Sequence, residues 1–169
     1  RFVQHIDNQN FSKAIFQAMY HLRDSYEELS KKSPYGVPYD NGNRTSGSWD
    51  VQTLGFYYCF LHDAYPDIFS PNYIFNSINF ILGCHPGSNT TSFVSGVGAK
   101  SATVAYGVNR ADWSYIPGGV TPGTILIRPD LPELLDYPFL WQEGEYCMGG
   151  EASYFMYMVL AAQKILNKK

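Results

Sequence analysis

Hydrophobic residues recur every three or four positions in four segments of the chain, the spacing that places them on one face of a helix. These segments run from Phe11 to about Lys31, from Trp49 to about Tyr65, from Pro71 to Gly83 and from about Tyr146 to Asn167. The second segment is apolar on most faces, which indicates a helix buried among others. The pattern therefore predicts an all-α fold within a single domain.

Local residues mark the ends of the middle two helices. Ser48 can cap the second helix through its hydroxyl group. Ser70 followed by Pro71 is typical of a cap with proline at the first helical position. Gly83 is a natural C-terminal stop for the third helix.

The other segments have no sustained helical period. The stretch from Ser33 to Ser48 is rich in the turn residues Pro, Gly, Asp and Asn, and the stretch from Gly83 to about Leu140 has a Pro or Gly every few positions. Loops this long are usually functional or disordered, and the aromatic content of the second argues against disorder. Trp49 and Asp50 could line a cleft after the first loop, although a role at the helix start is favoured.

Aromatic residues make up 17% of the sequence, with 14 Tyr, 11 Phe and 3 Trp, and many of them lie in stretches rich in Gly and Pro. Flat rings outside a core often line binding surfaces, because they offer contact area at little conformational cost. The net charge of -3 and the lack of Lys and Arg runs argue against a nucleic-acid partner. No apolar run approaches the roughly 20 residues of a membrane span, so no membrane partner is expected.

The sequence holds no pattern typical of a metal or phosphate site. Its four histidines lack the H-x-x-x-H spacing of zinc ligands. Cys59, Cys84 and Cys147 are odd in number and widely spaced, which favours buried free thiols over a disulfide framework. The glycines near Gly96 and Gly118 lack the lysine and following helix of a phosphate loop. We therefore expect no metal and no cofactor.

Two stretches carry a resemblance to a known family. Asn79–Pro86, followed by Ser92–Gly98, is similar to a signature in which a helix ends in Leu-Gly-x-Asn-Pro and continues into Ser-Phe-Val-Thr-Gly-x-Gly. Glu145–Ala152 resembles the start of the last helix of the same family, Asn-Glu-x-x-x-Asp-x-Asn-Ala. The family is glycoside hydrolase family 9, and the resemblance covers most of the chain from about Phe11 onward.

The resemblance implies a fold and a mechanism. The family fold is an (α/α)6 barrel, and this chain has only enough helix for its C-terminal portion, so residues 1–169 are expected to form a single partial domain with a long irregular aromatic loop. Inverting hydrolysis needs an acid that protonates the leaving oxygen and a carboxylate, about 6.5–9.5 Å away, that activates water. Glu145 aligns with the acid. The base is expected before Arg1, so the isolated chain should be inactive.

Two other glutamates compete with Glu145 for the role of the acid. Glu143 and Glu151 also lie near the start of the last helix, where any glutamate could simply complement the helix dipole. The family alignment favours Glu145, and so does its place between Trp141 and Tyr146, where aromatic surroundings could raise its pKa. The positive end of the helix would oppose that rise.

The chain also departs from the family. Thr103–Val108 replaces a sugar-contacting Arg-Asn-Pro-His-His-Arg segment, while His85 and Gly149 replace an asparagine and an aspartate. A different substrate or binding mode is therefore expected. The residues that could supply the lost contacts are Tyr106, Arg110, Trp113, Tyr115 and Trp141. Each of these rings could instead pack against the scaffold, and Arg110 could pair with a nearby acid.

These observations predict a secreted or periplasmic glycosidase. Its partners would be a carbohydrate substrate and the missing N-terminal part of the same enzyme. A carbohydrate-binding or scaffold protein on the same fold is the main alternative, and an all-helical interaction domain is a third. Because the second and fourth helices are apolar around much of their surface, we also expect the isolated chain to associate with the rest of its barrel or with itself.

Overall fold

The computed structural model describes residues 6, 8–39, 47–84, 90–101, 106–107, 117–121, 146–147 and 149–168. Within these ranges the chain forms four helices, which are α1 (Gln9–Lys32), α2 (Gly47–Ala64), α3 (Asn72–Ile81) and α5 (Gly149–Leu166). The strands are short, and they are β1 (Thr91–Ser92), β2 (Lys100–Ser101), β3 (Tyr106–Gly107) and β4 (Tyr146–Cys147). The all-α class and the four predicted helices are confirmed.

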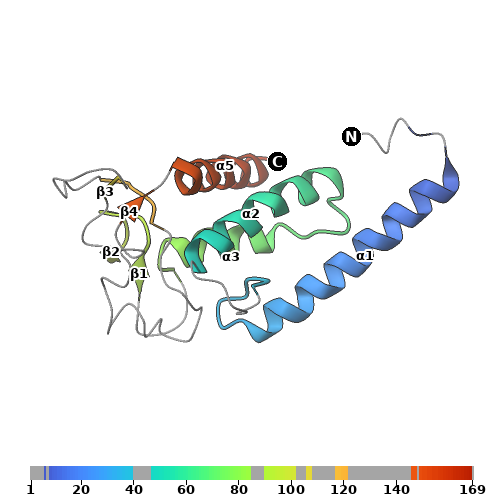
Figure 1. Cartoon of the computed structure of the whole chain (residues 1–169). Helices are drawn as coiled ribbons and strands as arrows, with labels where there is room; N and C mark the ends of the chain where they lie inside the picture. Colours follow the sequence, from blue (N-terminus) through green and yellow to red (C-terminus); the bar gives the residue numbers. More distant parts are fainter. Residues whose placement is uncertain are drawn as a thin grey trace.

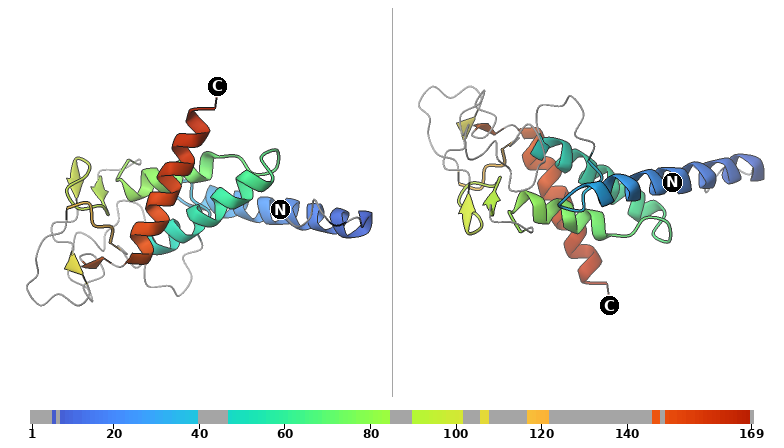
Figure 2. Two further views of the ribbon diagram at one scale, coloured as in Figure 1. Left: turned by 90° about the horizontal axis from the view of Figure 1, so that it is seen from above. Right: turned by 90° about the horizontal axis from the view of Figure 1, so that it is seen from below.

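The helices pack around α2. It contacts both α3 and α5, which also contact each other (Figure 1). Helix α1 lies beside this group, and its first half extends beyond it (Figure 2). The core draws on α2, α3 and α5 and on the segments that follow α1, α2 and α3. Its largest buried apolar side chains are Val37, Tyr58, Phe69, Ile74, Phe80, Ile81, Phe93 and Met158.

The three packed helices meet at Gly55 of α2. A Cβ atom at this position would lie 2.9 Å from Ser77 Cβ of α3, and closer still to the Met158 sulfur of α5. Atoms of this kind do not approach so closely, so only glycine fits without moving a neighbouring helix. The absence of a side chain at residue 55 therefore sets the distance between the helices.

Helix α3 ends at Gly83, as the sequence predicts. Gly83 has a φ of 72°, a conformation that costs glycine little and other residues more. The Cys84 N–H donates to Asn79 O at 2.8 Å, and the Gly83 N–H donates to Phe80 O at 3.2 Å. This pair of hydrogen bonds is the Schellman motif, which satisfies carbonyl groups at the helix end.

The predicted starts of α2 and α3 are displaced, by two residues toward the N-terminus in α2 and by one residue toward the C-terminus in α3. Helix α2 already includes Gly47, so Ser48 lies inside it, where its hydroxyl accepts a hydrogen bond from Gln52 Nε2 at 3.1 Å. Pro71 occupies the N-cap position of α3 rather than its first helical position. The Ser70 hydroxyl still accepts a hydrogen bond from the Asn72 N–H at 3.3 Å, so it does satisfy a free donor of the first turn.

None of the helices in the described ranges is both long enough and apolar enough to cross a membrane.

Replacing Gly55 with alanine should lower the free energy of unfolding. The added methyl group overpacks the junction, at a cost of about 1–3 kcal/mol, partly offset by the roughly 1 kcal/mol that alanine gains over glycine in a helix. Urea denaturation measures the difference. In a Ser77→Gly background, which removes the Cβ that the methyl group would meet, the cost should shrink. If Gly55→Ala instead raised the free energy of unfolding, α3 and α5 would have to lie further from Gly55 than these distances imply.

Replacing Gly83 with alanine should also destabilise the chain, and Gly118→Ala is the matched control. Both glycines have nearly the same φ, 72° and 73°. A Cβ at Gly83 would lie 2.9 Å from the Thr91 carbonyl carbon, whereas a Cβ at Gly118 would meet nothing within 4 Å. We expect a loss of roughly 1 kcal/mol for Gly118→Ala from backbone strain alone, and clearly more for Gly83→Ala. Equal losses would contradict the backbone clash.

Candidate functional site

The loops gather at one end of the helices. The C-terminal ends of α1 and α3 and the N-terminal ends of α2 and α5 all lie at this end, and so do the strands (Figure 1). The opposite end carries the short link between α2 and α3. Binding residues are often carried by loops held on a rigid scaffold. The loop end is therefore the candidate functional site.

The segment that resembles the Ser-Phe-Val-Thr-Gly-x-Gly signature is tied firmly to the core. Phe93, Val94 and Ser95 are buried. The Phe93 N–H donates to Ile81 O at 2.8 Å, just before the end of α3, and the Thr121 N–H donates to Phe93 O at 2.9 Å. The segment is therefore a platform that joins α3 to the chain around residue 120.

The serines of this segment have structural partners. The fully buried Ser92 hydroxyl accepts a hydrogen bond from the Val94 N–H at 3.0 Å, and the Ser95 hydroxyl accepts one from the Gly119 N–H at 3.1 Å. The exposed part of the segment is the turn that follows, where Gly96 and Gly98 have φ values of 72° and 92°. This turn, and not the serines, is the part that a ligand can reach.

The second motif begins in a strand and not in the last helix. Helix α5 starts at Gly149, three residues later than predicted, because Tyr146 and Cys147 form β4. Strand β4 pairs in parallel with β3, with Tyr106 opposite Tyr146 and Gly107 opposite Cys147. The backbone of Tyr106 thus lies beside the residue that follows Glu145. Glu145 precedes α5 by four residues, so it stands outside the first turn, where a helix dipole acts most strongly.

Most of the predicted site residues lie outside the part of the chain that the structure describes. These residues are Glu143, Glu145, Arg110, Trp113, Tyr115, Trp141 and His85. Tyr106 lies in β3 and Glu151 lies in α5, but their side chains are not described. The strand pairing sets the backbone of Tyr106 beside that of Tyr146, a contact that the sequence did not predict.

A hollow between α1 and α2 lies close to the loop end. Its volume is about 310 Å³, and its lining includes Tyr26, Pro38, Tyr39, Asp50 and Tyr57. Small-molecule sites typically combine rings with a few polar groups, at volumes of roughly 300–1,000 Å³. Sequence reasoning favoured a helix-start role for Asp50. Asp50 is in the first turn of α2, and it also lines this hollow. The Gly-rich loop before Asp50 is the feature of the sequence that indicates a place in a cleft.

The titratable groups that are described do not form a metal centre. Among these residues there is no cluster of three or more His, Cys, Asp or Glu side chains that could hold a metal ion.

Comparison with known proteins gives no relative from which a role could be transferred. No family model matches the chain, and neither a curated protein nor a solved structure matches it.

The described cysteines differ in environment. Cys59 is buried, as predicted, and its thiol donates to Gly55 O at 3.2 Å. Burial raises the pKa of Cys59 to about 11. Cys84 is exposed, so the prediction of a buried thiol is wrong there: it follows the stop at Gly83, where the chain leaves the core. The side chain of Cys147 lies outside the described residues.

Alkylation should therefore separate the two thiols. At pH 8, iodoacetamide should modify Cys84 on the order of 100-fold faster than Cys59, because thiolate is the reacting species and Cys59 holds its proton. Peptide mass spectrometry over time gives both rates, and the difference should vanish in denaturant. Similar rates in the folded chain would contradict the buried environment of Cys59.

Proposed function

We propose that the chain is the C-terminal portion of an (α/α)6-barrel glycosidase that resembles glycoside hydrolase family 9. The enzyme hydrolyses β-glycosidic linkages of a polysaccharide or oligosaccharide with inversion, outside the cell or in the periplasm. Glu145 is its general acid. The remaining part of the enzyme supplies the catalytic base and completes the cleft.

The observation that carries the proposal is the meeting of both family-like motifs at the loop end. The Ser92–Gly98 platform is fixed to the end of α3, and β4, which directly follows Glu145, is paired to β3 at the same end of the helices (Figure 1). Because α3 ends and α5 begins at this end of the helices, the two motifs are placed where both can contribute to one surface. A cleft at the loop end of a helical barrel is also what the resemblance implies.

The hollow at Asp50 supports a sugar ligand in particular. Tyrosine rings offer flat apolar faces for the C–H groups of a sugar, and a carboxylate accepts hydrogen bonds from its hydroxyl groups. The hollow contains both kinds of group within about 310 Å³. It would hold a single sugar unit.

Glu145 must hold a proton at working pH if it is the acid. Desolvation by aromatic side chains, such as its sequence neighbours Trp141 and Tyr146, would favour the neutral form. The helix dipole that would oppose this is weak, because α5 begins only at Gly149. The acid then protonates the leaving oxygen while the base draws a proton from water on the opposite face of the sugar.

Replacing Glu145 with glutamine in the full-length protein tests the proposal. The amide cannot donate a proton as an acid does, so kcat on a natural glycan should fall roughly 10²–10⁴-fold while sugar binding remains. The dinitrophenolate group of a dinitrophenyl glycoside departs without being protonated. Glu145→Gln should therefore lower the rate of hydrolysis of this substrate much less. Both rates are measured by standard hydrolysis assays.

Glu143→Gln is the matched control, because it makes the same change two residues away. It should leave both rates within a few-fold of the unmodified enzyme. If Glu143→Gln showed the leaving-group dependence and Glu145→Gln did not, the acid would be misassigned.

A carbohydrate-binding protein on the same fold is the second candidate. It is favoured by the replacement of the family's sugar-contacting segment by Thr103–Val108 and of its helix aspartate by Gly149. Such a protein would bind glycans without hydrolysing them, so no variant could lower a rate of hydrolysis.

A further inference from the structure

An open groove lies at the end of the helices away from the loops. It is bounded by the first half of α1, the end of α2, the link after α2 and the middle of α5, and its volume is about 840 Å³. Aromatic rings form much of its wall. These rings belong to Phe16, Phe60, Tyr65 and Tyr157.

The wall of the groove is already organised. Phe60 and Tyr157 stack with ring centroids 5.2 Å apart, and Phe16 meets Tyr65 edge-on at 5.7 Å. Yet Phe16, Phe60 and Tyr157 are 45%, 48% and 40% exposed. A preformed apolar wall that is left half uncovered is suited to a protein partner.

The charge of the groove is negative. Its charged lining residues are Asp63 and Asp67. The C-terminal end of α2, where helix carbonyl groups carry partial negative charge, also lies in it. Asp63 reaches Lys164 at 3.4 Å, whereas Asp67 is exposed and makes no ion pair within the described ranges. The groove therefore favours an apolar helix that carries a cation.

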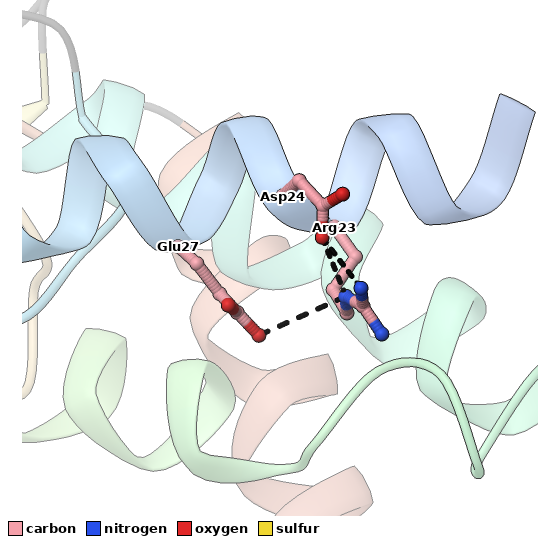
Figure 3. Close-up of polar contacts among 3 residues, drawn as sticks. All are labelled: Arg23, Asp24 and Glu27. Atoms are coloured by element: carbon pink, nitrogen blue, oxygen red, sulfur yellow. Dashed lines mark hydrogen bonds and ion pairs between the residues drawn. The ribbon is translucent and has the colours of Figure 1, made fainter.

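Helix α1 presents such a surface on its projecting half. Lys13, Phe16, Tyr20 and Arg23 follow one another at intervals of three, four and three, so they share one face. Between Gln9 and Arg23 the helix has no acidic residue. Arg23 is already paired with Asp24 at 2.5 Å and lies 3.8 Å from Glu27 (Figure 3). Lys13 is exposed and has no ion pair among the described residues, which leaves it as the available cation.

We propose that the groove receives α1 from a second copy of this chain. The two copies form a closed two-fold dimer in which each α1 lies along the groove of the other, with Lys13 of one copy near Asp67 of the other. Phe16 belongs both to the α1 face and to the groove, so the two surfaces are continuous, as a two-fold interface requires. The proposal uses none of the residues on which the glycosidase function rests, because the loops lie at the opposite end. The two proposals are compatible where the rest of the barrel leaves this groove open.

The uncovered apolar area is sufficient for such an interface. Six large apolar side chains of α1 and of the groove region are 40–61% exposed. They are Phe11, Phe16, Tyr20, Phe60, Tyr157 and Leu160. Together they expose on the order of 500 Å². A standard interface buries about 800 Å² per partner, of which a little over half is apolar.

Sedimentation of the chain at roughly 5–100 μM tests the proposal, since a standard interface often gives affinities in this range or tighter. The expected mass is twice 19.1 kDa. Lys13→Glu alone and Asp67→Lys alone should each raise the dissociation constant about tenfold or more. The double variant restores opposite charges across the interface and should return to within a few-fold of the original value.

Lys32→Glu is the matched control, because it makes the same charge reversal in the last turn of α1, away from the projecting half. It should leave the dissociation constant unchanged, and circular dichroism should show that every variant is folded. A folded monomer at all concentrations, an open series of larger species, a Lys32→Glu effect equal to that of Lys13→Glu, or a double variant without recovery would each overturn the proposal.

Discussion

The close approach of α2, α3 and α5 at Gly55 is the constraint on which the rest of the structure depends. It lets Met158 and Ser77 pack directly over the backbone of α2. Burial of polar atoms in this core has a cost, because Gln52 Oε1 and Ser77 Oγ have no hydrogen-bond partner among the described residues, at about 1–3 kcal/mol each. Apolar packing in the surrounding core must outweigh that cost. The junction also fixes the ends of α3 and α5 from which the loops emerge.

The sequence predicts the features that local signals determine. Hydrophobic spacing identifies all four helices, because each packs apolar side chains against the core. The stop at Gly83 follows from a backbone conformation that glycine adopts readily. The starts of α2 and α3 differ from the predicted ones by two residues and by one, within the usual variation of helix ends.

Features that depend on contacts between distant residues could not be predicted in this way. The start of α5 moves to Gly149 because Tyr146 pairs with Tyr106, and nothing near residue 146 signals that partner. The buried hydroxyl groups of Ser92 and Ser95 belong to the motif in sequence, yet Ser92 Oγ also donates to Ile81 O at 3.4 Å and Ser95 Oγ accepts from the distant Gly119 N–H. Gly55 looks like an ordinary helix glycine until the helices that touch it are known.

The parallel pairing of β3 with β4 bears on the order in which the chain folds. Helices α2 and α3 are joined by a short link, so their packing closes a small loop, whereas the β3–β4 pair closes the long stretch from residue 108 to residue 145. The chain loses conformational entropy when a long loop closes, before the distant contacts can stabilise the structure. The helical hairpin therefore forms early during synthesis, and the segment that carries the candidate acid joins it late, once the last helix has left the ribosome and docked.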